Sequence, residues 1–566
     1  MRTLFAFAAV LAIAFCSTAQ EAPRVQEAAL YLERMVPFGF SGSVLVMHEG
    51  KVLLEKGYGM ADRVRKIPNT PDTLFDIGSI VKTFTATAIQ KYVDSGRVSL
   101  DDTLPKFFDG VPEDKRAITV RQLMTHTAGL PLYTGEDYEL VPREKMISMA
   151  FSEKLRFEPG TRWAYCNSCY SLLATVLEKL SGQDYESYVH EHLLVPAGMT
   201  QTGYVIPNFL GRNVARGYRG AVDDGSPLQK AWYGDGPSWS LRGNGGFLSS
   251  VRELALWARA LDGTKVASAA TKARAAEAVI ATGRTPDEKM GYGWFVQDTP
   301  QGRMVSHSGG NGVFANHLRR YVDRDVVVVV SSNNAQESWS PHERNFVALL
   351  FGGTAAIPPA PAGTVPVADL AGRYRLPTGR EVELRLQDGQ LVVDALSAPE
   401  VATLVRPVNA LTGARAKELE SAAKAALEQM TAGDTSLIQK SLIPDMPAKE
   451  EPAFWKQWMA DQEKRHGKFV AVTPLWTVPV KDKEDLHTVV LMQFTTGSVL
   501  VRWEQRANGI LAQAFPPRLF PDQYRFIPQG PDKLVTWNAF LGASGSVTVE
   551  KDAIVLGQVR ATRVRQ

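Results

Sequence analysis

A serine and a lysine three residues apart carry the strongest chemical signal in the sequence, in the segment Ser79-Ile80-Val81-Lys82. The apolar residues that follow recur at helical spacing, so both side chains are expected on one face of a helix. Ser79 would lie at the helix start, where free backbone N–H groups favour developing negative charge. A lysine with a lowered pKa can then take the hydroxyl proton and make Ser79 a nucleophile. For the pair alone, an N-cap serine beside a solvated lysine is the simpler interpretation.

A second segment, Tyr165-Cys166-Asn167, follows a Pro-Gly turn and precedes another predicted helix. A loop at this place can present a phenol and a carboxamide side by side. Beside a lysine, the phenolate of Tyr165 would be favoured electrostatically, which makes Tyr165 a candidate general base and acid. Asn167 can donate to a substrate carbonyl and hold the lysine.

A third segment, His307-Ser308-Gly309-Gly310, precedes the last strands predicted in the first half of the chain. Its small residues would allow a substrate backbone to lie against a strand. A cation or donor at His307 would face the carboxylate of the substrate or the oxygen of the tyrosine. The three segments together favour the catalytic interpretation of the serine and lysine over the simpler one.

The order of these motifs resembles that of the serine β-lactamase-related superfamily. This superfamily comprises class C β-lactamases, D-alanyl-D-alanine carboxypeptidases of the same peptidase family and family VIII esterases. The resemblance covers about residues 25–350. The segments that carry it, in chain order, are Gly57-Tyr58-Gly59-Met60-Ala61-Asp62, Ser79 to Lys82, Leu123-Met124-Thr125-His126-Thr127-Ala128-Gly129-Leu130, Tyr165 to Asn167 with Tyr170-Ser171-Leu172-Leu173, Gly245-Gly246-Phe247-Leu248-Ser249-Ser250, and His307 to Gly310.

The resemblance implies a role for each catalytic candidate. Ser79 is expected to become acylated, and Lys82 and Tyr165 are expected to transfer its proton. The backbone N–H groups of Ser79 and Gly310 would form the oxyanion hole. Asn167 and the segment from His307 to Gly310 would contact the substrate.

Two positions depart from the class C pattern. Those enzymes usually carry Lys-Thr-Gly where this chain has His307-Ser308-Gly309, and a serine where this chain has Cys166. A histidine at the first position is more similar to the carboxypeptidase and esterase members. We therefore expect β-lactam hydrolysis to be weak or absent.

The chain contains three cysteines, and Cys166 and Cys169 form a C-x-x-C pattern across the second motif. Two buried free thiols are the favoured interpretation. A local disulfide is the alternative in an exported protein, and it would stiffen the loop of Tyr165. A redox role would need a different fold around the pair. Two cysteines are too few for a Cys-based zinc site, and we expect neither a metal nor a cofactor.

For several other histidines and aromatic residues, we weighed a structural role against a functional one. His190 and His192 point to different sides of a predicted helix, which disfavours a shared metal. His126 lies in a turn motif of the family and is interpreted as a structural histidine. Tyr233 and Trp239 could line the substrate cleft or pack in the core, and the sequence favours neither.

Composition and charge limit the class of protein. The 566 residues are 45% hydrophobic and 22% charged, as in ordinary globular domains. The net charge is 63 − 60 = +3, too small to indicate a nucleic-acid partner. Residues 1–19 resemble a signal peptide with cleavage after Ala19, so we expect an exported, periplasmic or secreted protein. No later apolar stretch is long enough to predict a membrane span.

The chain divides into unequal regions. We expect a serine hydrolase domain over 20–356, a Pro-rich linker over 357–366 and a mainly β C-terminal region over 367–566. The C-terminal region resembles the small β-barrel-like domains attached to such hydrolases. A segment at about 416–516 resembles a nuclear-transport-factor-like cone and would be inserted into it.

The predicted fold is α/β in the α+β sense, with an antiparallel sheet, flanking helices and an all-helical lobe. The predicted function is hydrolysis of a D-amino-acid peptide, ester or amide carbonyl through a serine acyl-enzyme, with a small molecule or short peptide as substrate. The alternative is a non-catalytic protein that binds cell-wall fragments or a protein partner.

Overall fold

The computed structural model describes residues 22–220, 222–230, 236–334, 339–387, 389–394, 397–405, 410–434, 451–479, 486–505, 511–515, 523–538 and 543–564. The predicted signal peptide, with its cleavage site after Ala19, and Tyr233 lie outside these residues. Among the helices described, none is long and apolar enough to cross a membrane.

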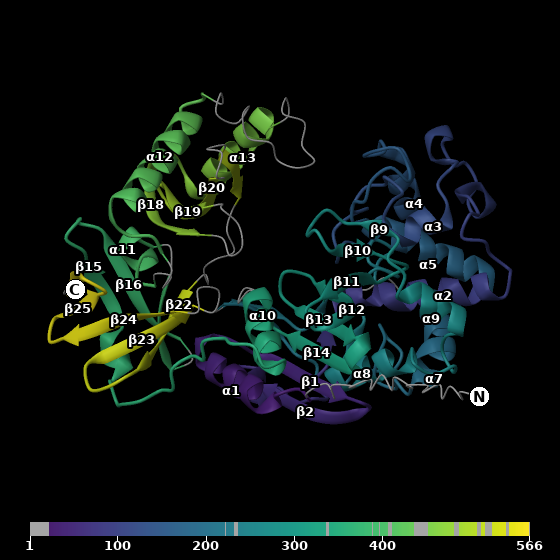
Figure 1. Ribbon diagram of the computed structural model, residues 1–566, viewed down its shortest axis with the longest axis horizontal. Coiled ribbons are helices and arrows are strands. Elements are labelled where there is room, and N and C mark those ends of the chain that lie inside the picture. The colour runs from purple at the N-terminus through teal and green to yellow at the C-terminus, as the bar shows by residue number, and fades with distance from the viewer. Residues whose placement is uncertain are drawn as a thin grey trace, which may run out of the picture.

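An eight-stranded antiparallel sheet forms the centre of the first region (Figure 1), in the order β2-β1-β14-β13-β12-β11-β10-β9. The sheet joins both ends of this region, because the hairpin of β1 and β2 pairs with β14. This confirms the predicted antiparallel sheet. Its strands are β1 (Gly42–His48), β2 (Lys51–Tyr58), β9 (Ile280–Ala281), β10 (Glu288–Met290), β11 (Phe295–Thr299), β12 (Gly302–Gly310), β13 (Ala315–Tyr321) and β14 (Val326–Ser332).

The valine run of β14 shows how the sequence builds two cores on this sheet. Val327 and Val329 face the helical lobe, whereas Val326, Val328 and Val330 face α1 (Val25–Met35) and α10 (Trp339–Leu350). Successive side chains of a strand point to opposite faces, so an unbroken apolar run fits a strand that is covered on both sides. Helices α1 and α10 lie together against one face in Figure 1.

The predicted helical lobe covers the other face of the sheet. The sequence sets its helix ends locally: Thr119 and Gln122 form a capping box at α3, and Gly182, with a φ of 73°, ends α5. The helices of the lobe and its borders are α2 (Val81–Asp94), α3 (Val120–Met124), α4 (Arg143–Ser152), α5 (Asn167–Ser181), α6 (Tyr185–Val189), α7 (Val195–Ala197), α8 (Val251–Ala260) and α9 (Ala269–Ala275). Short paired strands complete the region: β3 (Met60–Asp62), β4 (Ile67–Pro68), β5 (Phe75–Asp76), β6 (Gly217–Arg219), β7 (Val222–Gly225) and β8 (Leu248–Ser249).

A closed antiparallel barrel forms most of the C-terminal region, in the order β15-β16-β17-β22-β23-β24-β25-β26. Its strands are β15 (Gly372–Arg375), β16 (Glu381–Gln387), β17 (Gln390–Asp394), β22 (Gln523–Pro528), β23 (Lys533–Asn538), β24 (Ala543–Glu550), β25 (Ala553–Leu556) and β26 (Val559–Arg563). Ile527, Val535 and Trp537 join the core beneath α1, so the barrel packs against the first region.

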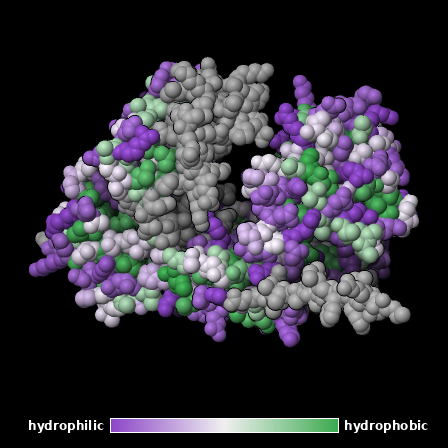
Figure 2. Space-filling view, in the orientation of Figure 1, coloured by the Kyte–Doolittle hydropathy of each residue, from purple (hydrophilic) through white to green (hydrophobic). Residues whose placement is uncertain are grey.

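A separate four-stranded sheet stands between β17 and β22 in the chain. It contains β18 (Phe469–Pro479), β19 (Leu486–Phe494), β20 (Ser498–Gln505) and β21 (Leu511–Phe515), accompanied by α11 (Pro399–Ala402), α12 (Gly413–Thr431) and α13 (Glu451–His466). Helix α12 packs on β18. In the space-filling view, hydrophilic residues are spread over the described face of both regions (Figure 2).

Candidate active site

A tight turn between β5 and α2 presents Ser79. Residues Gly78–Ile80 form a single 3-10 turn, and α2 follows at once. Gly78 has a φ of 49°, and a Cβ atom there would lie 2.4 Å from the backbone nitrogen of Gly310. A Cβ atom on Gly309 would lie 2.7 Å from the nitrogen of Ser79. The two glycines therefore allow the end of β12 to lie against the turn over Gly78–Ile80, which we call the nucleophile turn. This close approach brings the backbone N–H groups of Ser79 and Gly310 near each other.

Ser79 and Lys82 form a close pair at the start of α2. The Lys82 Nζ atom lies 2.9 Å from Ser79 Oγ and donates to the backbone oxygen of Asn244 at 2.6 Å. Lys82 is completely buried, whereas Ser79 is partly accessible. Burial lowers the pKa of Lys82 well below its usual value, and the negative charge of Asp137 opposes this only in part. A neutral amine so close to the hydroxyl has a lone pair that can accept its proton.

The structure also brings Tyr165 to Ser79, but in a different protonation state from the one that we predicted. The Tyr165 hydroxyl is hydrogen-bonded to Ser79, and Lys82 Nζ lies 5.0 Å from the centre of its ring. Burial raises the pKa of Tyr165, and this outweighs the hydrogen bond and the charge of Arg284. The expected phenolate is therefore wrong: Tyr165 is a phenol, and Lys82 is the member of the pair whose charged form is disfavoured by burial.

His126 packs against Tyr165, in agreement with the structural role predicted for this histidine. Its ring stacks on that of Tyr165 with centroids 4.4 Å apart, and its Nδ1 atom accepts the N–H of Cys166 at 3.1 Å. Burial lowers the pKa of His126 well below its usual value, so the ring is neutral. A neutral ring can accept this hydrogen bond, whereas a protonated one could not.

Cys166 and Cys169 are joined by a disulfide, so the favoured prediction of two free thiols is wrong. Cys166 is the N-cap of α5, and the bridge spans the first turn of that helix with a Cα–Cα distance of 5.3 Å. A cysteine pair at i and i+3 across a helix start is near enough for a bridge, which spacing alone did not decide. The disulfide fixes the turn that carries Tyr165 and Asn167.

Asn167 is buried next to the site but does not hold the lysine. Its backbone N–H donates to the oxygen of Leu132 at 2.9 Å, and its side-chain oxygen has no hydrogen-bond partner among the described residues. Lys82 is held instead by the backbone oxygen of Asn244, whose side chain bonds to Ser171 and Ser240. Asn244 lies in a Gly-rich segment, and its spacing from Lys82 in the sequence does not predict the hydrogen bond between them.

His307 faces the site from β12 as a neutral ring. Its Nδ1 atom lies 2.7 Å from the backbone oxygen of Ser308, which requires Nδ1 to carry the proton and leaves Nε2 as an acceptor. Nε2 is buried without a partner among the described residues. Burial lowers the pKa of His307 to about 3. The predicted cation or donor at this position is therefore wrong at neutral pH.

Arg284 supplies the cation that His307 does not, and no motif in the sequence points to this residue. Its guanidinium lies over the rings of Trp163 and Phe295, at 5.2 and 4.3 Å, and forms an ion pair with Glu288 at 2.7 Å. Its charge acts on Tyr165 and His307. Arg284, His307 and the exposed Ser308 line a cavity of about 630 Å³ along β11 and β12.

The buried carboxyl group of Asp76 forms hydrogen bonds to the nucleophile turn and to two loops beside it. Asp76 accepts hydrogen bonds from the N–H of Gly78 at 2.9 Å, the hydroxyl of Tyr138 at 3.2 Å and the amide of Asn311 at 3.0 Å. Burial nevertheless raises the pKa of Asp76 to about 6, and the charge of Asp137 acts in the same direction.

The raised pKa of Asp76 predicts a pH dependence of stability. The folded protein holds this proton up to about pH 6, whereas an unfolded aspartate releases it near pH 3.8. The free energy of unfolding should therefore fall by up to about 3 kcal/mol between pH 4 and pH 6 because of this group. In Asp76→Asn this part of the slope should vanish, as measured by urea unfolding at a series of pH values. Equal slopes in the two proteins would contradict the assignment.

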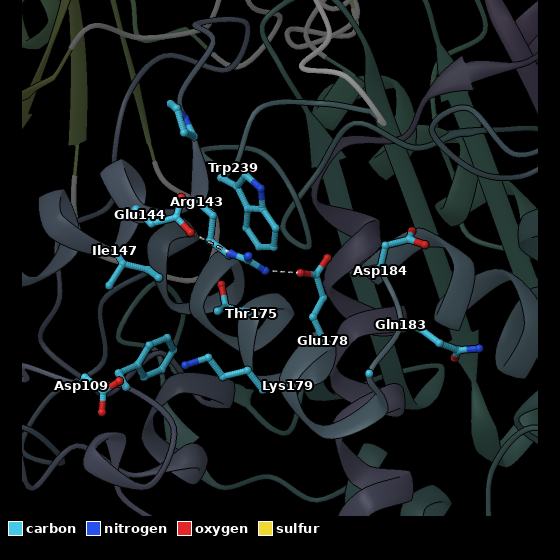
Figure 3. A pocket seen from close by; sticks show the side chains of 13 residues that line it. Asp109, Arg143, Glu144, Ile147, Thr175, Glu178, Lys179, Gln183, Asp184 and Trp239 are labelled. Carbon is cyan, nitrogen blue, oxygen red and sulfur yellow. Dashed lines mark hydrogen bonds and ion pairs between the residues drawn. The ribbon is translucent and has the colours of Figure 1, made fainter.

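Trp239 is buried and lines a different cavity, of about 850 Å³, between α4 and α5. Figure 3 shows Arg143 beside the Trp239 ring and between Glu144 and Glu178; the ion pair with Glu178 measures 2.7 Å. This cavity contains none of the predicted site residues, so Trp239 does not line the cleft at Ser79. In the described part of the chain, no group of three or more His, Cys, Asp or Glu side chains is placed to hold a metal ion.

A buried lysine with a lowered pKa beside a serine, where a sheet meets a helical lobe, defines the site of a serine hydrolase. A model of the Beta-lactamase family matches residues 39–352, more than half of the chain. The chain belongs to this family, which confirms the predicted resemblance.

Among individual relatives, the chain is 28% identical to penicillin-binding protein 4* of Bacillus subtilis over 387 residues, 63% of this chain and 84% of that protein. Protein flp of Staphylococcus aureus is 32% identical over 184 residues, 31% of this chain and 37% of that protein. The chain thus spans little more than a third of that second relative. An octameric penicillin-binding protein homologue from Pyrococcus abyssi aligns over 95% of this chain and all of its own, with a TM-score of 0.53 and 19% identity, which shows a shared fold.

Proposed function

We propose that this protein is an exported serine hydrolase that forms an acyl-enzyme on Ser79 with a D-amino-acid peptide, an ester or an amide. The observation that carries the proposal is the buried Lys82 amine, 2.9 Å from Ser79 Oγ and held by Asn244. Burial lowers the pKa of this amine well below its usual value, which makes it a candidate base for the serine. The names of the penicillin-binding relatives are consistent with substrates of this kind. The proposal of export rests on the apolar segment within residues 1–19.

The geometry supports a two-step acyl transfer. Lys82 takes the proton of Ser79 while Oγ attacks the carbonyl carbon, and the oxyanion is stabilised by the N–H groups of Ser79 and Gly310. Tyr165, a phenol hydrogen-bonded to Ser79, gives its proton to the leaving group and regains one from Lys82. Water then attacks the acyl-enzyme by the same proton transfers in reverse, which releases the acid and restores Ser79.

The neutral His307 supports peptides and esters over β-lactams as substrates. A ring that is neutral and presents an acceptor nitrogen offers no positive charge in place of the lysine found in class C β-lactamases. We expect kcat/KM for a p-nitrophenyl ester and for a peptide ending in D-Ala-D-Ala to exceed that for a chromogenic cephalosporin at least about 10-fold. The three substrates should be assayed in parallel with one enzyme preparation. Fastest turnover of the cephalosporin would refute this ranking.

A further inference from the structure

The proposed oxyanion hole is built from two segments that are far apart in the chain. One N–H group belongs to Ser79 in the nucleophile turn, and the other belongs to Gly310 at the end of β12. Strand β12 belongs to the central sheet, whereas β5, which leads into the nucleophile turn, pairs with β8 in a separate two-stranded sheet. The spacing of the two N–H groups therefore depends on the contacts that connect these two segments.

The carboxyl group of Asp76 connects the two segments directly. Asp76 is the last residue of β5 and is 3% exposed. One carboxyl oxygen accepts the N–H of Gly78, the residue before Ser79, at 2.9 Å. The other oxygen accepts the side-chain amide of Asn311, the residue after Gly310, at 3.0 Å. A single carboxyl group thus holds the chain neighbours of both N–H groups.

Two further side chains complete this connection. The hydroxyl of Tyr138 donates to the same oxygen of Asp76 at 3.2 Å and accepts from the amide of Asn311 at 3.0 Å. The buried amide of Asn316, on β13, donates to the backbone oxygen of Asp76 at 2.8 Å. A buried polar network whose bonds are made in this way is rigid, so Asp76 has little freedom to move relative to β12 and β13.

We propose that Asp76, together with Asn311, is a positioning residue that sets the spacing of the oxyanion hole. This inference rests on the proposed function and assigns to it two residues that act through the backbone of their neighbours. Preorganised donors stabilise the oxyanion of the transition state more than the carbonyl of the bound substrate. A loosened hole should therefore lower kcat and change KM little, whereas the loss of a merely structural contact would lower stability alone.

The hydrogen bonds predict that exchanging the two side chains restores the connection. In Asp76→Asn an amide faces the amide of Asn311, so two donors meet and their bond is lost. In Asn311→Asp two carboxylates meet and repel one another. In the double variant Asp76→Asn/Asn311→Asp a donor again meets an acceptor, with the direction of the bond reversed. The hydroxyl of Tyr138 both donates and accepts, so it fits either arrangement.

The test combines steady-state kinetics on a p-nitrophenyl ester with inhibition by phenylboronic acid, which adds to a serine oxygen and mimics the tetrahedral oxyanion. Asp76→Asn should lower kcat about 30-fold, change KM less than about 3-fold and weaken the inhibition about 30-fold. Asn311→Asp should show the same pattern. The double variant should recover kcat and the inhibition constant to within about 5-fold of the wild type. Acylation and deacylation both pass through an oxyanion, so kcat reports on the hole whichever step is slower.

Asp62→Asn is the matched control for the loss of a buried carboxylate. Asp62 is 2% exposed and accepts hydrogen bonds from the N–H of Arg65 at 2.8 Å and from its Nε at 2.7 Å. It contacts Arg65 rather than the nucleophile turn, so this variant should lower stability but leave kcat and the inhibition unchanged. Urea unfolding of each variant separates its effect on stability from its effect on the rate.

Tyr138→Phe provides a second variant in case Asp76→Asn does not fold. It removes one bond from the same carboxyl group, and it should lower kcat and weaken the inhibition by equal factors of about 3 to 10. An unchanged kcat in folded Tyr138→Phe would then overturn the proposal.

Three results with a folded Asp76→Asn would overturn the positioning role and leave the hydrolase in place. These are a kcat within about 3-fold of the wild type, a loss that appears in KM or stability but not in kcat, and a double variant no more active than Asp76→Asn alone. Absence of both turnover and inhibition in the wild type would instead contradict the proposed function, on which this inference rests.

Discussion

Replacing Ser79 by alanine should reduce hydrolysis of every substrate to the background rate, a loss of at least about 10³-fold in kcat. The hydroxyl is the atom that bonds to the carbonyl carbon, and no other described side chain lies within hydrogen-bond distance of Lys82 Nζ. The free energy of unfolding should change by less than about 1 kcal/mol, because Ser79 is only partly buried. Steady-state kinetics and urea unfolding of the same preparation measure both effects.

A serine on the surface provides the control for this variant. Ser152 lies at the exposed end of α4, and Ser152→Ala should keep full activity. Substantial turnover by Ser79→Ala would show that another group is the nucleophile, or that water is activated directly.

Replacing Lys82 by methionine should separate activity from stability. Methionine fills the space of the lysine stem but has no basic nitrogen, so kcat/KM should fall at least about 10³-fold. The variant removes a buried amine that is costly to hold in an apolar setting, and it also deprives the oxygen of Asn244 of its donor. These two effects oppose one another, and the free energy of unfolding should change by less than about 2 kcal/mol.

Lys91 lies on the same helix and donates to the backbone oxygen of Val266 at 3.1 Å. Lys91→Met therefore removes a comparable hydrogen bond away from the site, and we expect it to retain activity. If Lys82→Met kept more than about a tenth of the wild-type kcat/KM, another base would have to activate Ser79.

Local patterns in the sequence explain the parts of the fold that local rules govern. The turn at Glu49 and Gly50 has both residues at positive φ, as a tight hairpin requires, and the valine run of β14 is buried on both faces. The sequence motifs also named Ser79, Lys82 and Tyr165, which the structure brings together although Tyr165 is far from the other two in the chain.

What the sequence could not predict depends on burial and on contacts between distant segments. The predicted protonation states of Tyr165 and His307 are wrong, because the pKa of each ring depends on how deeply folding buries it. Asn244 and Lys82 are 162 residues apart, and no spacing rule connects them. Arg284 stands in a segment without a motif, and only the folded structure shows that it lines the cavity beside His307.

The central claim is that Ser79 becomes covalently acylated with the help of the buried Lys82, and intact-protein mass spectrometry tests it most directly. After incubation with a fluorophosphonate and, separately, with a labelled penicillin, peptide mapping should place one adduct on Ser79. Ser79→Ala should carry none, and Lys82→Met should react at least about 10²-fold more slowly. An adduct on another residue, or none with either probe in a folded wild type, would contradict the account.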